Sequence, residues 1–424
     1  MRIRDVRFSP GVTGFFFDDQ RAIKRGAAHD GFTYTGQPVT AGFTAVRQAG
    51  ESLSILLRLD DGQVACGDAA AVQYSGAGGR DPLFLAGAYE DVLREHLRPA
   101  LVGHELESFK ADAQWLDGLQ VNGDRLHTAL RYGLSQALLD AHAKANHELM
   151  VEVLCREFDL PLMAEPVPVF GQTGDDRYDG ADKMILKQVD VLPHGLINNI
   201  DDKLGRHGEI LREYIQWLTD RIQRLRLDEG YKPQLHIDVY GNIGTIFDDD
   251  AGRIAEYLAT LAPSADPFQL YIEGPVDREA RAPQIELLAA IKERLTAHGS
   301  PVRIVADEWC NTFDDIRAFT DAACCHMVQI KTPDLGSIHN IVESVRYCKQ
   351  RDMESYQGGT CNKTDVSTRA CVHVAQAARA ERLLAKPGMG FDEGYMIVRN
   401  EMNRTLELLR ARDEERSEEH TSEL

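Results

Sequence analysis

From Pro166 onward, the sequence alternates between short strand-like segments and longer amphipathic segments. The strand candidates are mainly apolar, and they lie at Val167–Phe170, Met184–Val191, Leu235–Val239, Leu270–Glu273, Val302–Ala306, Met327–Ile330, Glu354–Gln357 and Arg382–Ala385. The amphipathic segments lie at Glu209–Arg226, Asp250–Leu261, Asp277–Ala297, Thr312–Ala323, Leu335–Gln350 and Asp365–Arg379. Eight strands joined by helical crossovers in about 250 residues predict a parallel (β/α)8 barrel. An open doubly wound sheet is the alternative, but the first turn, FGQTGDD, lacks the full glycine-rich fingerprint of that fold.

Residues 1–160 follow a different pattern, in which strand signals precede helical ones. Ser52–Leu59 and Gln63–Gly67 flank Asp60-Asp61-Gly62, which predicts a β-hairpin. Helical periodicity follows at Asp91–Leu97 and Leu126–Asn146. We therefore predict an α+β domain over residues 1–160 and a barrel over residues 161–410. The polar, charge-rich end, residues 411–424, predicts a disordered tail.

The composition excludes some partners. Asp and Glu outnumber Lys and Arg by 67 to 47, which gives a formal net charge of −20 and argues against a nucleic-acid-binding surface. The sequence contains no apolar run long enough to span a membrane, and MRIRDVRFSP lacks the apolar core of a secretion signal. The eight cysteines include no CxxC pair, so we expect reduced thiols and a cytoplasmic protein.

Three predicted strands carry a carboxylate at or next to their C-terminal end: Asp238, Glu273 and Asp307. Each follows the previous one by roughly 35 residues, about one strand and one helix, and the C-terminal ends of barrel strands meet at the face where active sites are built. A single Asp or Glu is more often a helix cap or a solvated charge, but three carboxylates at that face would repel one another without a cation. Because no cysteine or histidine belongs to the set, it predicts Mg²⁺ or Mn²⁺ rather than zinc.

Lys331 follows the strand-like segment MVQI and precedes Thr332-Pro333, which ends the strand. A lysine there is often an ion-pair partner of a nearby carboxylate. As a base it must be uncharged, and we expect burial and a neighbouring cation to lower its pKa from about 10.4. His194 follows the second predicted strand. A histidine there is more often structural, but its position across the barrel mouth makes it a candidate acid/base partner of Lys331.

Uncharged polar residues at other strand ends are candidates for substrate binding. Gln172 follows the first predicted strand, and Gln329 lies two residues before Lys331 on the same strand face. Gly358-Gly359-Thr360-Cys361 follows the seventh strand, where glycines let backbone N–H groups approach an anion. Each of these residues could instead be a turn or core contact. The glycine-rich loop SGAGGRD lacks the GK[ST] of a phosphate loop and predicts a mobile lid, with Gln73 near its hinge.

The order of three carboxylates and a lysine at successive strand ends resembles the enolase superfamily. Longer stretches resemble the methylaspartate ammonia-lyase family: GFFFDDQRAIKRGAAHDGFTYTG, AAVQYSGAGGRDPLF, NGDRLHTALRYG, LHIDVYGNIG, VADEWCNT, HMVQIKTPDLG, GGTCN and LAKPGMGFDEG. The resemblance extends from the first strand to about Arg410. It implies an N-terminal capping domain on a modified (β/α)8 barrel and a homodimer.

The resemblance also implies a reaction, the elimination of ammonia from L-threo-3-methylaspartate to give mesaconate, as in glutamate fermentation. It implies Mg²⁺ at Asp238, Glu273 and Asp307, with K⁺ as a monovalent activator, and an enediolate stabilised by the metal. Lys331 would be the base for the (2S,3S) substrate and His194 its counterpart on the other face. The implied substrate contacts are Gln172, His194, Gln329, Thr360 and Cys361. Two alternatives stay open: another enolase-superfamily reaction, such as acid-sugar dehydration or cycloisomerisation, and a non-catalytic ligand-binding barrel.

Overall fold

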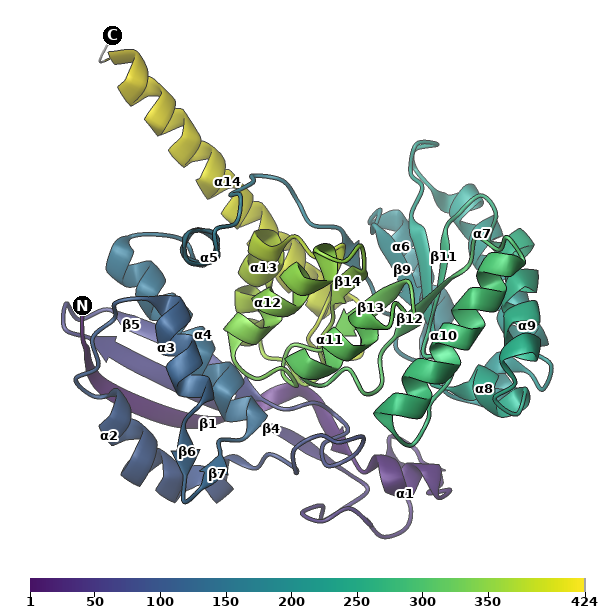
Figure 1. Ribbon diagram of the computed structural model, residues 1–424, viewed down its shortest axis with the longest axis horizontal. Coiled ribbons are helices and arrows are strands. Elements are labelled where there is room, and N and C mark those ends of the chain that lie inside the picture. Colours follow the sequence, from purple (N-terminus) through teal and green to yellow (C-terminus); the bar gives the residue numbers. More distant parts are fainter. Residues whose placement is uncertain (423–424) are drawn as a thin grey trace.

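Eight parallel strands close into a barrel in the order β10-β11-β12-β13-β14-β15-β8-β9 (Figure 1). The computed structural model describes residues 1–422. The barrel strands are β8 (Val169–Phe170), β9 (Val191–His194), β10 (Gln234–Asp238), β11 (Leu270–Glu273), β12 (Arg303–Ala306), β13 (Met327–Ile330), β14 (Glu354–Gln357) and β15 (Arg382–Leu384). The predicted parallel barrel is therefore confirmed, and the open-sheet alternative is wrong.

Helices follow the strands and pack around the barrel. They are α6 (Arg177–Leu186), α7 (Glu209–Leu225), α8 (Asn242–Ile246), α9 (Ala251–Ala265), α10 (Arg281–Ala297), α11 (Phe313–Asp321), α12 (Ile338–Lys349), α13 (Asp365–Ala378) and α14 (Asp392–Ser422), with the short π-helix η3 (Ile200–Leu204) after β9. Helix α7 shows why they form, because Leu211, Ile215, Leu218 and Ile222 are buried at helical spacing. Within residues 1–422, no helix has the length and apolar content needed to cross a membrane.

The prediction of a strand at Met184–Val191 is wrong. The first part of this segment ends helix α6, and strand β9 begins only at Val191. Ala181, Met184 and Ile185 are all buried on one face of α6, which is the three- and four-residue spacing of a helix. The short apolar run is compatible with either element, and the apolar position one turn earlier decides for the helix.

The residues before the barrel form an antiparallel sheet in the order β1-β4-β5, followed mainly by helices. Its strands are β1 (Ile3–Asp18), β4 (Arg47–Leu59) and β5 (Val64–Ala70), and two ribbons pair β2 (His29–Asp30) with β3 (Thr33–Tyr34) and β6 (Gln120–Val121) with β7 (Asp124–Arg125). The helical elements are α1 (Gln20–Lys24), η1 (Ala86–Tyr89), η2 (Val92–Leu97), α2 (Arg98–Leu101), α3 (Phe109–Asp117), α4 (Thr128–Asn146) and α5 (Met150–Phe158). The antiparallel pairing of β4 with β5 confirms the predicted hairpin.

Helix α4 joins the N-terminal sheet to the barrel. The side chain of Gln136 hydrogen-bonds the edge strand β5, because Gln136 Nε2 donates to Asp68 O at 3.0 Å and Asp68 N donates to Gln136 Oε1 at 3.3 Å. These bonds occupy the backbone groups of Asp68, which would otherwise be unpaired on the edge of the sheet. The same helix contacts the barrel, where Ile338 N of α12 donates to Ser135 Oγ at 3.0 Å. This packing holds the loops that follow β5 against the barrel.

Helix α14 continues to Ser422, whereas the sequence predicts a disordered tail from residue 411. Figure 1 shows the last turns of α14 leaving the body of the molecule. Glu and Arg are the most frequent charged residues of this segment and are good helix formers, so it prolongs a helix that has already begun at Asp392. Residues 423–424 of the predicted tail lie outside the described residues.

Candidate active site at the barrel mouth

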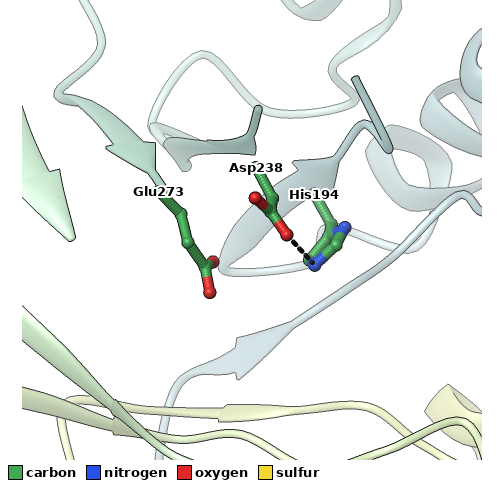
Figure 2. Close-up of side chains that lie close together, drawn as sticks. All are labelled: His194, Asp238 and Glu273. Atoms are coloured by element: carbon green, nitrogen blue, oxygen red, sulfur yellow. Dashed lines mark ion pairs between the residues drawn. The ribbon is translucent and has the colours of Figure 1, made fainter. Parts of the chain in front are cut away.

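The C-terminal ends of β9, β10 and β11 bring three polar side chains together. Parallel pairing sets Asp238 beside Glu273 and Ile237 beside His194. Ligand atoms of His194, Asp238 and Glu273 all lie within 4.8 Å of one another, and all three residues are buried. Figure 2 shows the His194 ring facing the Asp238 carboxylate, with Nε2 at 3.7 Å from Oδ2. The fold therefore places two of the three predicted carboxylates in one group, together with the predicted histidine.

Burial and mutual repulsion disfavour the charged forms of the carboxylates at the mouth. Burial, reinforced by the charge of Asp307, raises the pKa of Asp238 well above its usual range. Burial and then the charges of Asp238 and Asp307 raise the pKa of Glu273 in the same way. Burial also raises the pKa of Asp307, although Lys331 opposes it. A cation bound among these groups would relieve the repulsion.

Asp307 and Lys331 approach each other at the ends of neighbouring strands. Asp307 directly follows β12 and Lys331 directly follows β13, and these two strands pair. Lys331 Nζ lies 2.8 Å from Asp307 Oδ1, with the two side chains 14% and 12% exposed. The structure therefore brings the predicted base to the same mouth as the predicted metal ligands.

From the sequence, we expect burial and a neighbouring cation to lower the pKa of Lys331, and the effect of the cation stays a prediction. Burial disfavours the Lys331 ammonium, and Arg80 acts in the same direction. The carboxylates of Asp307, Glu308 and Asp334 outweigh both effects, so the pKa of Lys331 is raised. In this arrangement Lys331 is protonated at neutral pH and paired with Asp307.

His194 is a neutral group at the same mouth. It is the last residue of β9 and has a φ of 65°, an uncommon backbone conformation for a residue other than glycine. Burial, followed by the positive charges of Lys386 and Lys331, lowers the pKa of His194 to about 3. Its ring is therefore uncharged at neutral pH, and one nitrogen is free to accept a proton.

The candidate substrate-binding residues line a cavity at the mouth. Its lining consists of Val72, Gln73, Tyr74, Arg80, Gln172, His194, Asp238, Tyr240, Asp307, Glu308, Gln329, Lys331, Gly359, Thr360, Cys361, Leu384, Lys386 and Met389. Gln73, from the loop after β5, connects the two parts of the chain: Gln73 N donates to Thr360 Oγ1 at 3.2 Å, and Cys361 Sγ donates to Gln73 Oε1 at 3.2 Å. Gln329 Oε1 is buried without a hydrogen-bond partner among residues 1–422, so it can accept a hydrogen bond from a ligand.

Two family models together match almost the whole chain. Residues 1–159 match the methylaspartate ammonia-lyase N-terminus, and residues 161–411 match the methylaspartate ammonia-lyase C-terminus. The chain belongs to the methylaspartate ammonia-lyase family. The methylaspartate ammonia-lyase of Citrobacter amalonaticus is 61% identical over 97% of this chain and 100% of its own length.

Solved structures of methylaspartate ammonia-lyases share the fold closely. The crystal structure of the Citrobacter amalonaticus protein containing (2S,3S)-3-methylaspartic acid has a TM-score of 0.95 and covers 97% of this chain and 100% of its own, at 61% identity. The Mg complex of the β-methylaspartase from Clostridium tetanomorphum has a TM-score of 0.93 and covers 97% and 100%, at 56% identity.

The donor atoms in this member of the family fit a hard divalent cation. Asp238, Glu273 and Asp307 offer carboxylate oxygens, which Mg²⁺ prefers as ligands. Asp307 Oδ1 is buried without a hydrogen-bond partner of good geometry among residues 1–422, and the Lys331 ammonium lies 2.8 Å from it as an ion pair. A buried carboxylate oxygen without a hydrogen-bond donor, among repelling carboxylates, is a suitable ligand for a cation.

Sequence reasoning misses Lys386, although the signal for it is present. Lys386 lies just after β15, much as Lys331 lies just after β13. Its ammonium donates a hydrogen bond to Gln172 Oε1 inside the cavity. Burial lowers the pKa of Lys386 to about 8, with Lys363 and Lys331 adding to the effect and Cys361 opposing it. A search for lysines at every strand end would find this residue.

Sequence reasoning also misses Arg80, which lies in the glycine-rich loop predicted to be a mobile lid. Arg80 is anchored across the mouth: its Nε lies 2.8 Å from Asp334 Oδ2 and its Nη2 lies 3.1 Å from Glu308 Oε2. Its side chain is 3% exposed. Burial opposes charge on Glu308, but Arg80 and Lys331 lower the pKa of Glu308 to about 2. Both carboxylate partners of Arg80 lie more than 200 positions away from it in the sequence, so the composition of the loop alone does not reveal the contacts.

Proposed function

We propose that this protein is a Mg²⁺-dependent ammonia-lyase that eliminates ammonia from L-threo-3-methylaspartate to give mesaconate. The observation that carries the proposal is the 2.8 Å approach of Lys331 to Asp307 at a mouth that also holds Asp238 and Glu273. Family membership over nearly the whole chain supports it. Residues 1–159 act as a capping domain that contributes Gln73 and Arg80 to the cavity of the barrel domain.

Asp238, Glu273 and Asp307 are the residues that hold Mg²⁺ in this proposal. Mg²⁺, when bound, supplies positive charge beside the substrate carboxylate on which the charge of the enediolate develops. The three carboxylates lie at the ends of adjacent strands and depend on no flexible loop for their placement. This rigidity suits a site that must meet developing charge without rearranging.

Lys331 is the proposed base for the (2S,3S) substrate. Once Lys331 has released its own proton to solvent, its amine takes the proton from C3 and the C–H electron pair moves into the neighbouring substrate carboxylate as an enediolate. When that pair returns to form the C2–C3 double bond, the C2–N bond of the substrate ammonium breaks and its electrons leave with ammonia. Asp307 lies beside Lys331, and their opposite charges hold the two side chains together. His194, neutral and on the other side of the substrate, is the proposed base for the epimer at C3.

The amides and the Gly358–Cys361 turn are proposed to bind the substrate. Gln329 Oε1 accepts a hydrogen bond from the substrate amine, since it is buried without another donor among the described residues. Gln172, held by Lys386, lies on the cavity wall with Thr360 and Cys361. We also propose the homodimer and the K⁺ activation, which rest on the family resemblance.

The first test is ultraviolet detection of mesaconate from L-threo-3-methylaspartate, with an ammonia assay on the same samples. We expect equal amounts of both products with Mg²⁺ and none after treatment with a chelator. A barrel that binds methylaspartate without releasing ammonia, or that releases water from an acid sugar, would contradict the proposal.

A second test separates the two proposed bases. We expect His194→Ala to reduce turnover of the (2S,3R) epimer by a much larger factor than turnover of the (2S,3S) substrate. Separate kinetics with each isomer give the two factors. Equal losses on both isomers would count against proton transfer on two faces.

A further inference from the structure

Below the carboxylates, His236 and Arg382 form a buried polar row in the barrel interior, and the proposed mechanism does not use either residue. Strand β10 turns Gln234, His236 and Asp238 to the same side, at successive levels of the barrel. His236 Nε2 lies 2.8 Å from Glu273 Oε2, and Arg382 Nη1 of β15 lies 3.0 Å from His236 Nδ1. Glu273, His236 and Arg382 are each at most 1% exposed. Branched apolar side chains usually fill such interiors, so a histidine and an arginine here require a reason.

The arginine decides which ring nitrogen of His236 carries the proton. A guanidinium group has donors and no acceptor, so His236 Nδ1 must accept the hydrogen bond from Arg382. The ring proton therefore lies on Nε2, which donates to Glu273 Oε2. Arg382, the first residue of β15, thus fixes the tautomer of His236 from below the barrel mouth.

Neighbouring side chains hold this row in one orientation. The His236 ring stacks on Phe170, with ring centroids 4.3 Å apart and an interplanar angle of 20°. Arg382 Nη2 donates to Gln234 Oε1 at 2.6 Å, and its guanidinium lies 4.3 Å above the centre of the Tyr271 ring. Neither His236 nor Arg382 can rotate without losing these contacts.

The second oxygen of Glu273 is held from the opposite direction. The hydroxyl of Tyr356 donates to Glu273 Oε1 at 2.6 Å, and Gln329 Nε2 donates to the same oxygen at 3.3 Å. Each carboxylate oxygen thus has a donor before any cation binds. The plane of the Glu273 carboxylate is fixed, and the lone pairs left over are those available to a metal ion.

We propose that His236 and Arg382 are positioning residues for the metal site: Arg382 sets the tautomer of His236, and His236 sets the orientation of Glu273. This inference rests on the proposed function, in which Glu273 binds Mg²⁺. Partners of metal ligands typically change metal affinity about 10- to 100-fold when they are removed. The row therefore acts on the affinity for Mg²⁺, without contact with the substrate.

The test measures Mg²⁺ binding to the full-length protein by isothermal titration calorimetry. We expect His236→Leu to raise the dissociation constant for Mg²⁺ about 10- to 100-fold. His236→Gln, which keeps an N–H donor for Glu273, should recover most of that loss. Arg382→Met should raise the dissociation constant about tenfold, and Arg382→Lys, which keeps a donor for His236, should raise it less.

The matched control is Arg131→Met, because Arg131 is also a buried arginine. It pairs with Asp117, with Nη1 at 2.6 Å from Oδ1, in the N-terminal part of the chain. We expect this variant to lower the melting temperature and leave the Mg²⁺ dissociation constant unchanged. If His236→Leu does not fold, the comparison of His236→Gln, Arg382→Lys and Arg131→Met carries the test.

Two outcomes overturn the inference and are distinguishable. The first outcome is that the row only stabilises the barrel. The Mg²⁺ dissociation constant would then be unchanged in all folded His236 and Arg382 variants, or it would rise in every variant, Arg131→Met included, in proportion to the fall in melting temperature. The proposed function would then stand. Failure of the unmodified protein to bind Mg²⁺ would instead overturn the proposed function, and the inference with it.

Discussion

The barrel mouth and the contact between α4 and β5 are both buried, but they follow opposite principles. At the mouth, burial and neighbouring charges raise the pKa of Asp238 and Glu273. Between α4 and β5, two glycines let the backbones touch: a Cβ on Gly133 would lie 2.3 Å from Ala69 N, and one on Gly67 would lie 2.2 Å from Gly133 O. The mouth gathers buried charged groups, which raise the free energy of the folded state. The contact of α4 with β5 uses glycines, which have no Cβ to keep the two backbones apart.

The difference shows where this chain gains stability and where it gives stability up. Repelling buried carboxylates destabilise the folded state unless a cation neutralises them. Close packing of α4 on β5 stabilises the platform from which Gln73 and Arg80 reach the mouth. Substitutions in the two regions should therefore separate activity from stability.

The largest expected effect is on rate, at the mouth. Lys331→Ala removes the proposed base, and we expect turnover of the (2S,3S) substrate to fall by about 10²- to 10⁴-fold. The variant should still fold, because the pKa of Asp307 is already raised by burial and that carboxyl can take up a proton when its partner Lys331 is removed. Steady-state kinetics and circular dichroism measure the two properties. Near-normal rates would contradict the assignment of the base.

The next effect is on stability, at the contact of α4 with β5. Gly133→Ala places a Cβ against the backbone of Ala69, and we expect the free energy of unfolding to fall by about 3 kcal/mol. Gly87→Ala is the control, because a Cβ there meets no atom within 4 Å. Denaturant unfolding of both variants gives the comparison. Equal stability of the two would show that the backbones can separate at little cost.

The two regions also differ in how far sequence predicts them. Strand ends at the mouth follow from local patterns: the segments ending at Glu273 and Ile330 are predicted to the residue. The prediction for the α6 segment fails because an apolar run of a few residues is compatible with a helix or a strand, and only the buried Ala181, one turn earlier, shows the helical spacing. Arg80 illustrates the remaining limit, since its carboxylates at positions 308 and 334 are supplied by tertiary folding. Site residues at strand ends can therefore be predicted from the sequence, whereas site residues that a loop of the other domain contributes cannot.

A smaller effect should have opposite signs with and without metal. Asp238→Asn removes one repelling charge, so the metal-free protein should be as stable as the unmodified protein or more stable. The unmodified protein should gain about 2.7 kcal/mol when Mg²⁺ is present at 100 times its dissociation constant, and the variant should lose most of that gain. Thermal unfolding with Mg²⁺ and with a chelator measures both values. Asp248→Asn, an exposed substitution, is the control that should respond to Mg²⁺ normally.

The smallest expected effect comes from a carboxylate that behaves in the opposite way to those at the mouth. Glu401 of α14 lies 2.7 Å from Arg404 Nη2 and 3.3 Å from His373 Nε2 of α13. Burial opposes its charge, but hydrogen bonds from His373 and Arg404 lower the pKa of Glu401 to about 2.

A depressed pKa stabilises the fold above the unfolded value of about 4.3, and that stability is lost as the pH falls toward 2. We therefore expect Glu401→Gln to lower the free energy of unfolding by about 1 kcal/mol at pH 7 and by progressively less below pH 4.3. Urea unfolding at several pH values measures the difference, with Glu407→Gln as the control because Glu407 is 79% exposed on the same helix. If the difference between Glu401→Gln and the unmodified protein grows as the pH falls, Glu401 belongs with the repelled carboxylates of the mouth, and charge would be costly in both regions.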